Sequence, residues 1–282
     1  MIQVCECPRD AMQGIPNFIP TEVKIQYLNL LLQVGFYRLD FGSFVSPKAI
    51  PQMRDTAALV DRLNLQDSNT QLLAIVANER GAREAAAYDS ISVLGFPFSL
   101  SETFQQRNTH ASREEALKRT EIIADICFKA NKTPLVYLSM GFGNPYGDPW
   151  SPEIAIHYTH RLQDMGIQEI RIADTTGVSD IHKIKHLFPQ LQNHFPKLTF
   201  GLHLHSDPAT SLAKIETALA VGCKHFDSAL RGFGGCPMAE DVLVGNIATE
   251  TIMHLMQENN QVLPFNMDAW NQAVLFSTQV FG

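Results

Sequence analysis

Eight short stretches rich in β-branched and aromatic residues alternate with amphipathic helical segments along the whole chain. We expect strands at residues 2–5, 37–41, 71–76, 90–94, 135–139, 169–173, 199–205 and 225–228. Helical periodicity fills the segments between them, with breaks at residues such as Gly35 that suit a helix end. This alternation predicts an α/β protein whose parallel sheet closes into a single (β/α)8, or TIM, barrel. The structural alternative is an open, doubly wound sheet.

The length of 282 residues fits one such barrel, so we expect a single catalytic domain over residues 1–282, with a C-terminal helical extension at about 259–282. The net charge of −7 argues against a nucleic-acid-binding surface, and no apolar run is long enough to cross a membrane. Five cysteines, an odd number, favour a reducing compartment. With no export signal in view, we expect a cytoplasmic protein.

Glycine-rich phosphate-binding patterns are missing: the sequence has neither a G-x-G-x-x-G after its first strand nor a P-loop. In a (β/α)8 barrel, polar residues at the carboxyl ends of the strands form the active site. That rule selects a short set of side chains at or just after the expected strand ends. They are Arg9, Asp10, Asp40, Ser43, Ser139, Asp174, His203, His205, Cys236 and Asn246.

His203 and His205 form the most informative local pattern, because residues two apart on a strand project from the same face. With Asp10 and Asn246 they offer two nitrogen and two oxygen ligands. This mixture suits Mg²⁺, Mn²⁺ or Zn²⁺, with coordination positions left for a substrate. The alternative is that the two are ordinary polar histidines at a strand end.

Arg9 and Cys236 each allow a structural and a catalytic interpretation. Arg9 either closes the barrel mouth in a salt bridge or stabilises negative charge on a carbonyl oxygen as an enolate forms. Cys236 follows three glycines within four residues. The segment is either a surface turn or a mobile lid whose thiol exchanges a proton with the substrate.

Several motifs occur in order from one end of the chain to the other. They are CPRDAMQ at 7–13, SFVSPK at 43–48, PQM at 51–53, SE at 101–102, DTTG at 174–177, HLH at 203–205, GGCP at 234–237 and GNIATE at 245–250. Together they resemble the 3-hydroxy-3-methylglutaryl-CoA lyase family. These lyases are metal-dependent (β/α)8 enzymes of the DRE-TIM metallolyase group, which also contains isopropylmalate and citramalate synthases.

The resemblance implies a carbon–carbon lyase that cleaves 3-hydroxy-3-methylglutaryl-CoA, an acyl-CoA, to acetyl-CoA and acetoacetate through an enolate. If the matching positions have the same roles as in the family, Asp10, His203, His205 and Asn246 hold a divalent cation, Mg²⁺ or Mn²⁺. Arg9 stabilises the enolate, Cys236 is the lid thiol, and His203 is a second candidate for proton transfer. Asp40, Asp174 and Glu250 match acidic positions that orient the site.

The residues expected to bind substrate are Gln13, Ser43, Lys48, Ser101, Glu102 and Ser139. For Lys48 the alternative is a solvated loop charge. Relatives are commonly dimers, so we expect a homodimer.

This chain departs from the family pattern at four places. Asp40 stands where the family has glutamate, Ser206 where an acid or amide is common, and Asn144 where a cysteine is found. The stretch 236–246 is one residue longer than usual. We expect these changes to affect the lid or the acyl group rather than the type of reaction.

Two kinds of alternative compete with the lyase: a different acyl-CoA enzyme and a protein without catalysis. The first is an acyl-CoA-dependent, Claisen-type synthase of the isopropylmalate or citramalate kind, or a lyase for another 3-hydroxyacyl-CoA, since the same metal and arginine would serve. The second is a barrel that binds a metal or a partner without catalysis. The clustering of polar residues at strand ends speaks against the second alternative.

Overall fold

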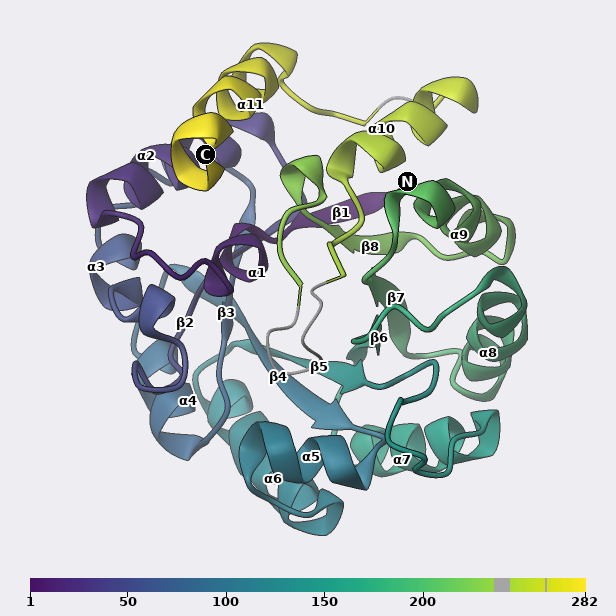
Figure 1. The fold of residues 1–282 in the computed structure, drawn as a ribbon. Coiled ribbons are helices and arrows are strands. Elements are labelled where there is room, and N and C mark those ends of the chain that lie inside the picture. The colour runs from purple at the N-terminus through teal and green to yellow at the C-terminus, as the bar shows by residue number, and fades with distance from the viewer. Residues whose placement is uncertain (236–243, 262) are drawn as a thin grey trace.

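A computed structural model describes residues 1–235, 244–261 and 263–282 of the chain. Within them, eight parallel strands close into the expected barrel, in the order of the sequence (Figure 1). The first strand pairs with both the second and the last, through Cys5 beside Arg38 and Val4 beside Phe226. The strands are β1 (Gln3–Glu6), β2 (Arg38–Ser43), β3 (Gln71–Ile75), β4 (Ile91–Ser99), β5 (Thr133–Ser139), β6 (Glu169–Asp174), β7 (Thr199–Leu204) and β8 (His225–Ser228).

Helices surround the barrel on the outside, and among those described none is long and apolar enough to cross a membrane (Figure 1). They are α1 (Pro8–Gln13), α2 (Thr21–Val34), α3 (Thr56–Val60), α4 (Glu79–Ala86), α5 (Glu102–Thr109), α6 (Arg113–Lys129), α7 (Pro152–Asp164), α8 (Ile181–His194), α9 (Pro208–Ala220), α10 (Thr249–Glu258) and α11 (Met267–Phe281). Two 3₁₀ turns, η1 (Pro51–Met53) and η2 (Leu230–Gly232), lie in the loops.

Local signals set several helix ends. The Ser112 hydroxyl accepts a hydrogen bond from the Glu115 amide, while the Glu115 carboxylate accepts one from the Ser112 amide, which forms a capping box at the start of α6. Gly35 ends α2 with φ +88°, a conformation that glycine adopts without strain. Because these contacts involve residues close together in the chain, the alternation of strands and helices can be predicted from the sequence.

Strand β4 is longer than the sequence suggested. We expected it to end at residue 94, but it continues through Gly95 and Pro97 to Ser99. Proline lacks a backbone N–H, and glycine has low strand propensity, so the local sequence pattern is interrupted there. Pairing with β5 from Val93 to Ser99, with Pro97 opposite Tyr137, continues the strand through both residues.

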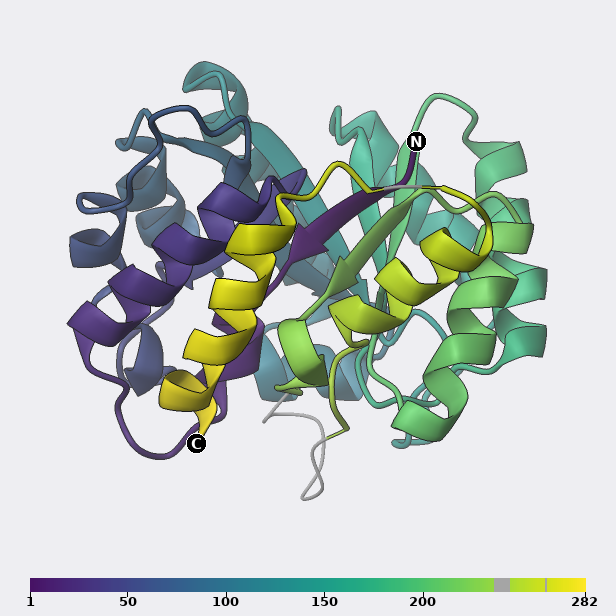
Figure 2. The same ribbon diagram turned by 90° about the horizontal axis from the view of Figure 1, so that it is seen from above.

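The C-terminal extension is helical, as expected, and α11 lies along α2 (Figure 2). Tyr27 of α2 packs against both Phe276 and Phe281 of α11, with ring centroids 6.5 and 5.9 Å apart. Phe281 also stacks on Phe233, in the loop after β8, at 4.3 Å. The extension therefore connects the outer helical layer to a loop at the carboxyl end of the barrel.

Candidate active site

Arg9 and Asp10 reach the barrel mouth because α1 begins directly after β1, with Pro8 at its first turn. Arg9 Nη1 donates to Asp10 Oδ1 at 3.0 Å and to Gln13 Oε1 at 2.9 Å. Gln13 Nε2 donates to the same Asp10 oxygen at 3.0 Å. One turn of helix therefore fixes the orientation of the Asp10 carboxylate from two sides.

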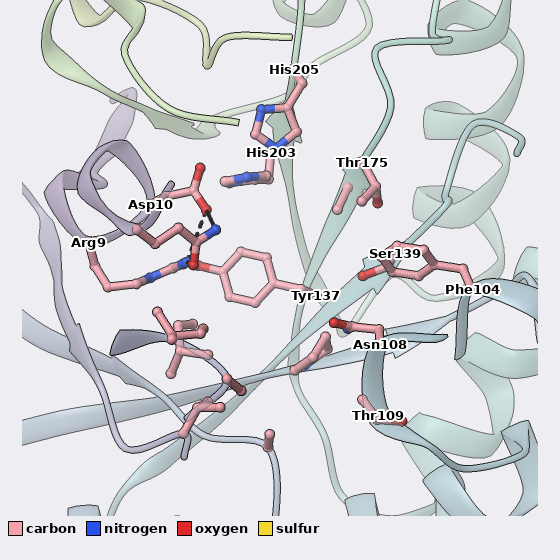
Figure 3. Close-up of a pocket in the computed structure, with 18 residues that line it drawn as sticks. Arg9, Asp10, Phe104, Asn108, Thr109, Tyr137, Ser139, Thr175, His203 and His205 are labelled. Carbon is pink, nitrogen blue, oxygen red and sulfur yellow. Dashed lines mark hydrogen bonds and ion pairs between the residues drawn. The ribbon is translucent and has the colours of Figure 1, made fainter. Parts of the chain in front are cut away.

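His203 and His205 approach Asp10 from the end of β7 (Figure 3). Their rings lie 5.0 Å apart, and one ligand atom from each of the three residues falls within 4.8 Å of the other two. All three side chains are buried. The sequence pattern thus predicted correctly that the two histidines lie on the same face of one strand end, and that Asp10 lies at the same end of the barrel.

The charge state of the cluster suits a divalent cation. Burial alone would raise the pKa of Asp10. The charge of Arg9, and after it the charges of the two histidines, which are protonated in the acidic range where Asp10 titrates, outweigh burial and hold that pKa at about 2. Burial, and then the neighbouring His203, lower the pKa of His205 to about 4. Among the described residues His205 Nδ1 has no hydrogen-bond partner. An anionic carboxylate beside a neutral imidazole with an unused nitrogen fits a cation site.

Asn246 lies against the same carboxylate. Its Nδ2 donates to Asp10 Oδ2 and to the Phe233 carbonyl, both at 2.8 Å, and its backbone forms a bridge with His205. The side chain thus meets the cluster through its amide nitrogen, and its role as a ligand stays a prediction. Gly234 has φ +100°, and a Cβ there would lie 2.7 Å from Asn246 Nδ2. The loop after β8 passes this close to the cluster because that residue has no side chain.

Arg9 is held from the opposite side by Asp40. That residue lies within β2 (Arg38–Ser43), which extends two residues beyond the end at residue 41 that we expected. Both Nε and Nη2 of Arg9 donate to the carboxylate, with Nη2 2.5 Å from Oδ2. Asp40 is fully buried and does not line the cavity described below. Asp40 thus contacts Arg9 directly, and the orienting role that we expected for it stays a prediction.

A cavity of about 200 Å³ opens beside these groups (Figure 3). Its polar wall carries Arg9, Asp10, Gln13, Ser139, Thr175, His203 and His205. Its apolar wall carries Val45, Ala49, Ile50, Ile75, Ala77, Pro97 and Phe104, together with Tyr137. The cavity therefore offers charge at one end and hydrocarbon contact at the other, as a site for an acyl group requires.

Tyr137 is a site residue that the sequence analysis missed. Its ring lies edge-on to His203, 5.5 Å between centroids, and its side chain points toward Arg9 and Asp10 in Figure 3. The buried hydroxyl has no hydrogen-bond partner among the described residues. The available signal was its spacing of two from Ser139, which places both on the inward face of β5.

Like Asp40, the other two expected acidic residues, Asp174 and Glu250, do not line the cavity. Asp174 accepts hydrogen bonds from the Val178 and Ser179 amides, at 2.9 and 3.0 Å, and so shapes the loop after β6. Glu250 accepts from the Arg231 amide at 3.0 Å. Both carboxylates hold loops at the barrel mouth, and a direct part in the reaction stays a prediction for each.

The expected substrate-binding residues divide in the same way. Gln13 and Ser139 line the cavity, whereas Ser43, Lys48, Ser101 and Glu102 do not. Ser101 caps α5 by accepting from the Phe104 amide, and Glu102 pairs with Arg113. Lys48 is exposed in the loop between β2 and η1.

Cys236, the expected lid thiol, lies outside the described residues. The other four cysteines are buried and form no disulfide among the described residues. Cys127, at 0% exposure on α6, is part of the hydrophobic core, as its helical position suggested.

Comparisons with known proteins agree with this geometry. The HMGL-like family model matches residues 2–274. The hydroxymethylglutaryl-CoA lyase of Bacillus subtilis is 34% identical over 89% of this chain and 83% of its own length. The cytoplasmic 3-hydroxy-3-methylglutaryl-CoA lyase of Rattus norvegicus is 32% identical over 88% of this chain and 72% of its own.

Solved structures are similar over nearly the whole chain. The crystal structure of the Bacillus subtilis HMG-CoA lyase superposes with a TM-score of 0.91, at 31% identity, over 99% of this chain and 93% of that one. An HMG-CoA lyase from Acinetobacter baumannii, in complex with coenzyme A and 3-methylmalate, gives a TM-score of 0.91 at 27% identity, covering 99% of this chain and 91% of that one. The barrel, the site at its mouth and these relatives together show that the chain belongs to the HMGL-like family, among the hydroxymethylglutaryl-CoA lyases.

Proposed function

We propose that the protein is a divalent-metal-dependent lyase that cleaves 3-hydroxy-3-methylglutaryl-CoA to acetyl-CoA and acetoacetate. The observation that carries the proposal is the convergence of Asp10, His203 and His205 within 4.8 Å, beside Arg9 and a cavity with an apolar wall. The relatives reported above, in sequence and in structure, are lyases of this substrate, which favours the lyase over a Claisen-type synthase.

A bound divalent cation would polarise the substrate oxygens that it contacts and lower the pKa of the hydroxyl group. Asp10, His203 and His205 are the residues that would hold it, with Asn246 as the fourth candidate. The donor set of nitrogen and oxygen atoms suits Mg²⁺ or Mn²⁺, and Zn²⁺ is the third candidate.

Arg9 is suited to stabilise the enolate that forms when the carbon–carbon bond breaks. Four of its five N–H groups are taken by Asp10, Gln13 and Asp40, which fix the plane of the guanidinium. One Nη2 hydrogen keeps no acceptor among the described residues and remains for the substrate. A preorganised donor of this kind stabilises charge as it develops, without reorganisation at the moment of reaction.

Proton transfer is assigned by the family resemblance to Cys236, with His203 as the second candidate. The glycine-rich loop before Cys236 passes directly over Asp10 and Asn246, which supports the assignment. The thioester arm is expected near Lys48, whose loop also supplies Val45, Ala49 and Ile50 to the apolar wall. Coenzyme A bound to the Acinetobacter relative supports an acyl-CoA substrate.

The proposal includes a homodimer, which rests on the resemblance alone, and a cytoplasmic location. The location is supported by four buried thiols that form no disulfide in the described part of the chain. Gel filtration and fractionation of cells test these two points independently of catalysis.

A coupled assay for acetoacetate tests the activity. Purified protein with 3-hydroxy-3-methylglutaryl-CoA should release acetoacetate when Mg²⁺ or Mn²⁺ is present, and none after chelation. Acetyl-CoA and a 2-oxo acid are the control substrates, because release of free coenzyme A from them would identify a synthase instead. A protein that binds Mn²⁺ but leaves the thioester intact would contradict the proposal.

A further inference from the structure

A chain of buried charges runs through the barrel interior beneath the proposed cation site. At its upper end Asp227, on β8, lies between two partners: Oδ1 accepts a hydrogen bond from Arg171 Nε at 3.1 Å, and Oδ2 lies 3.3 Å from His203 Nδ1. Below, Arg171 neighbours Glu169, whose carboxylate pairs with Arg38 Nη1 at 2.9 Å. Arg171 and Asp227 are 1% and 3% exposed, so their interactions are shielded from water.

The path of Arg171 requires a gap in the intervening strand. Arg171 lies on β6 and Asp227 on β8, so the guanidinium must cross β7 to make the contact. It does so over Gly201, where a Cβ would lie 2.9 Å from Arg171 Cδ and 2.7 Å from His225 Cβ. The absence of a side chain at that one position thus brings an arginine beneath the histidine two residues further along the same strand.

The pairing dictates which nitrogen of His203 faces the site. A carboxylate that is paired with a guanidinium is an acceptor only, so the His203 nitrogen that contacts it carries a hydrogen. Nδ1 is that nitrogen. The other ring nitrogen, Nε2, then has its lone pair directed away from Asp227, and is the atom left for a cation. With both ring nitrogens engaged, His203 has none left for proton transfer, which leaves Cys236 as the candidate for that step.

We propose that Asp227, held by Arg171, is a positioning residue that fixes the orientation and tautomer of His203, so that Nε2 is its metal ligand. This inference rests on the proposed cation site. The inference extends the site by Asp227, which lies on a different strand from the histidines and which no sequence spacing or motif connects with them.

Cys5 and Cys7 raise a competing interpretation, because ligand atoms of both lie within 4.8 Å of an Asp227 oxygen. Burial raises the pKa of each thiol above its usual range. Leu73, Val93 and Leu135 pack around them in the barrel interior, and Asp227 already has Arg171 and His203 as partners. Protonated thiols are poor cation ligands, and the charge of Asp227 is already balanced by Arg171. We therefore interpret Asp227 as a partner of His203 and not as a ligand in a second cation site.

Asp227→Asn tests the proposal in the full-length protein, with Mn²⁺ alone as the probe. The asparagine side chain has only one oxygen, so it can accept a hydrogen bond from Arg171 or from His203 but not from both. The other partner would then face the NH₂ group, which is also a donor. We expect the Kd for Mn²⁺, measured by electron paramagnetic resonance, to rise about 10- to 100-fold, as for other partners of metal-bound histidines. Glu169→Gln is the matched control: it neutralises a carboxylate of the same buried chain that does not touch His203, and its Mn²⁺ affinity should equal that of the wild type.

The tautomer itself supplies a second measurement, which needs no variant. In ¹⁵N-histidine-labelled wild-type protein with bound Mg²⁺, the long-range ¹H–¹⁵N spectrum should show His203 with its hydrogen on Nδ1. A hydrogen on Nε2 would overturn the proposal, even if Asp227→Asn does not fold. So would unchanged Mn²⁺ affinity in folded Asp227→Asn, or an equal loss in Glu169→Gln. Wild-type protein that binds no Mn²⁺ would instead contradict the cation site, and with it both the proposed function and this inference.

Discussion

Arg9 and Asp40 form a two-point contact at the barrel mouth, with Arg9 Nε and Nη2 lying 3.1 and 2.5 Å from Asp40 Oδ2. The two residues are 31 positions apart: Arg9 lies in α1, directly after β1, and Asp40 lies within the neighbouring strand β2. Burial raises the pKa of Asp40 to about 6, and the charge of Arg9 offsets only part of that effect. The carboxyl group is therefore ionised at neutral pH and becomes protonated as the pH falls through about 6.

This contact leads to a prediction for Asp40→Asn. Loss of the charge should release Arg9 from the plane in which it meets the enolate, and lower kcat on the order of 10²-fold, as for loss of an oxyanion donor. Wild-type kcat should fall below pH 6, and this acidic limb should be absent in Asp40→Asn. Asp40→Glu is the control, since it keeps the charge and should retain most of the rate. Steady-state kinetics over pH 5 to 8 would measure both effects, and an Asp40→Asn enzyme with a wild-type profile would count against the contact.

Removal of the cation should abolish turnover and lower stability together. Binding to the folded state alone stabilises it by about 2.7 kcal/mol at a concentration 100 times Kd. Added Mn²⁺ should therefore raise the Tm of the wild type, and chelation should reverse the shift. In His205→Ala the shift should disappear, while exchange of the exposed His194, on α8, for alanine should leave it intact. A persistent shift in His205→Ala would place the cation elsewhere.

Cys236→Ala should separate chemistry from metal binding. If the thiol exchanges the proton, the variant should lose most of its kcat while its Kd for Mn²⁺ stays at the wild-type value. Cys127→Ala serves as the control, because that buried thiol belongs to the core and its loss should affect Tm rather than kcat. Full activity in Cys236→Ala would remove the thiol from the mechanism.

Glu6 gives the fold an unusual dependence on pH. Its carboxyl group is fully buried and accepts hydrogen bonds from the Leu230 amide and the Thr249 hydroxyl, both at 2.6 Å. Burial raises its pKa to about 8, against the opposing effect of those two hydrogen bonds. Between about pH 4.5 and 8, the folded protein therefore keeps a proton that the unfolded chain releases.

The free energy of unfolding should accordingly fall as the pH rises through that window, by up to about 1.4 kcal/mol per pH unit from this group alone. Glu6→Gln removes the titration but can still accept from the Leu230 amide and donate to Thr249. The variant should gain stability relative to the wild type at pH 8 and lose that advantage at pH 5. Urea denaturation at the two pH values measures the difference, and parallel curves for the two proteins would contradict the prediction.

Some parts of this protein follow from local sequence. The eight strands alternate with helices because β-branched runs, capping residues such as Ser112 and terminators such as Gly35 act over a few residues. The pairing of His203 with His205 also follows locally, because a strand places alternate residues on one face.

The tertiary structure decided what lies next to those histidines. Tyr137, Arg171 and Asp227 carry no motif, and each comes from a different strand. They meet only because the barrel closes with one particular register, and because Gly201 leaves room for an arginine to cross a strand. The sequence alone determined the order of the strands and the position of the two histidines at the carboxyl end of β7, but not where β4 ends. Contacts across the barrel depend on the stagger between strands, which is set by the packing of the whole interior and leaves no short-range trace in the chain.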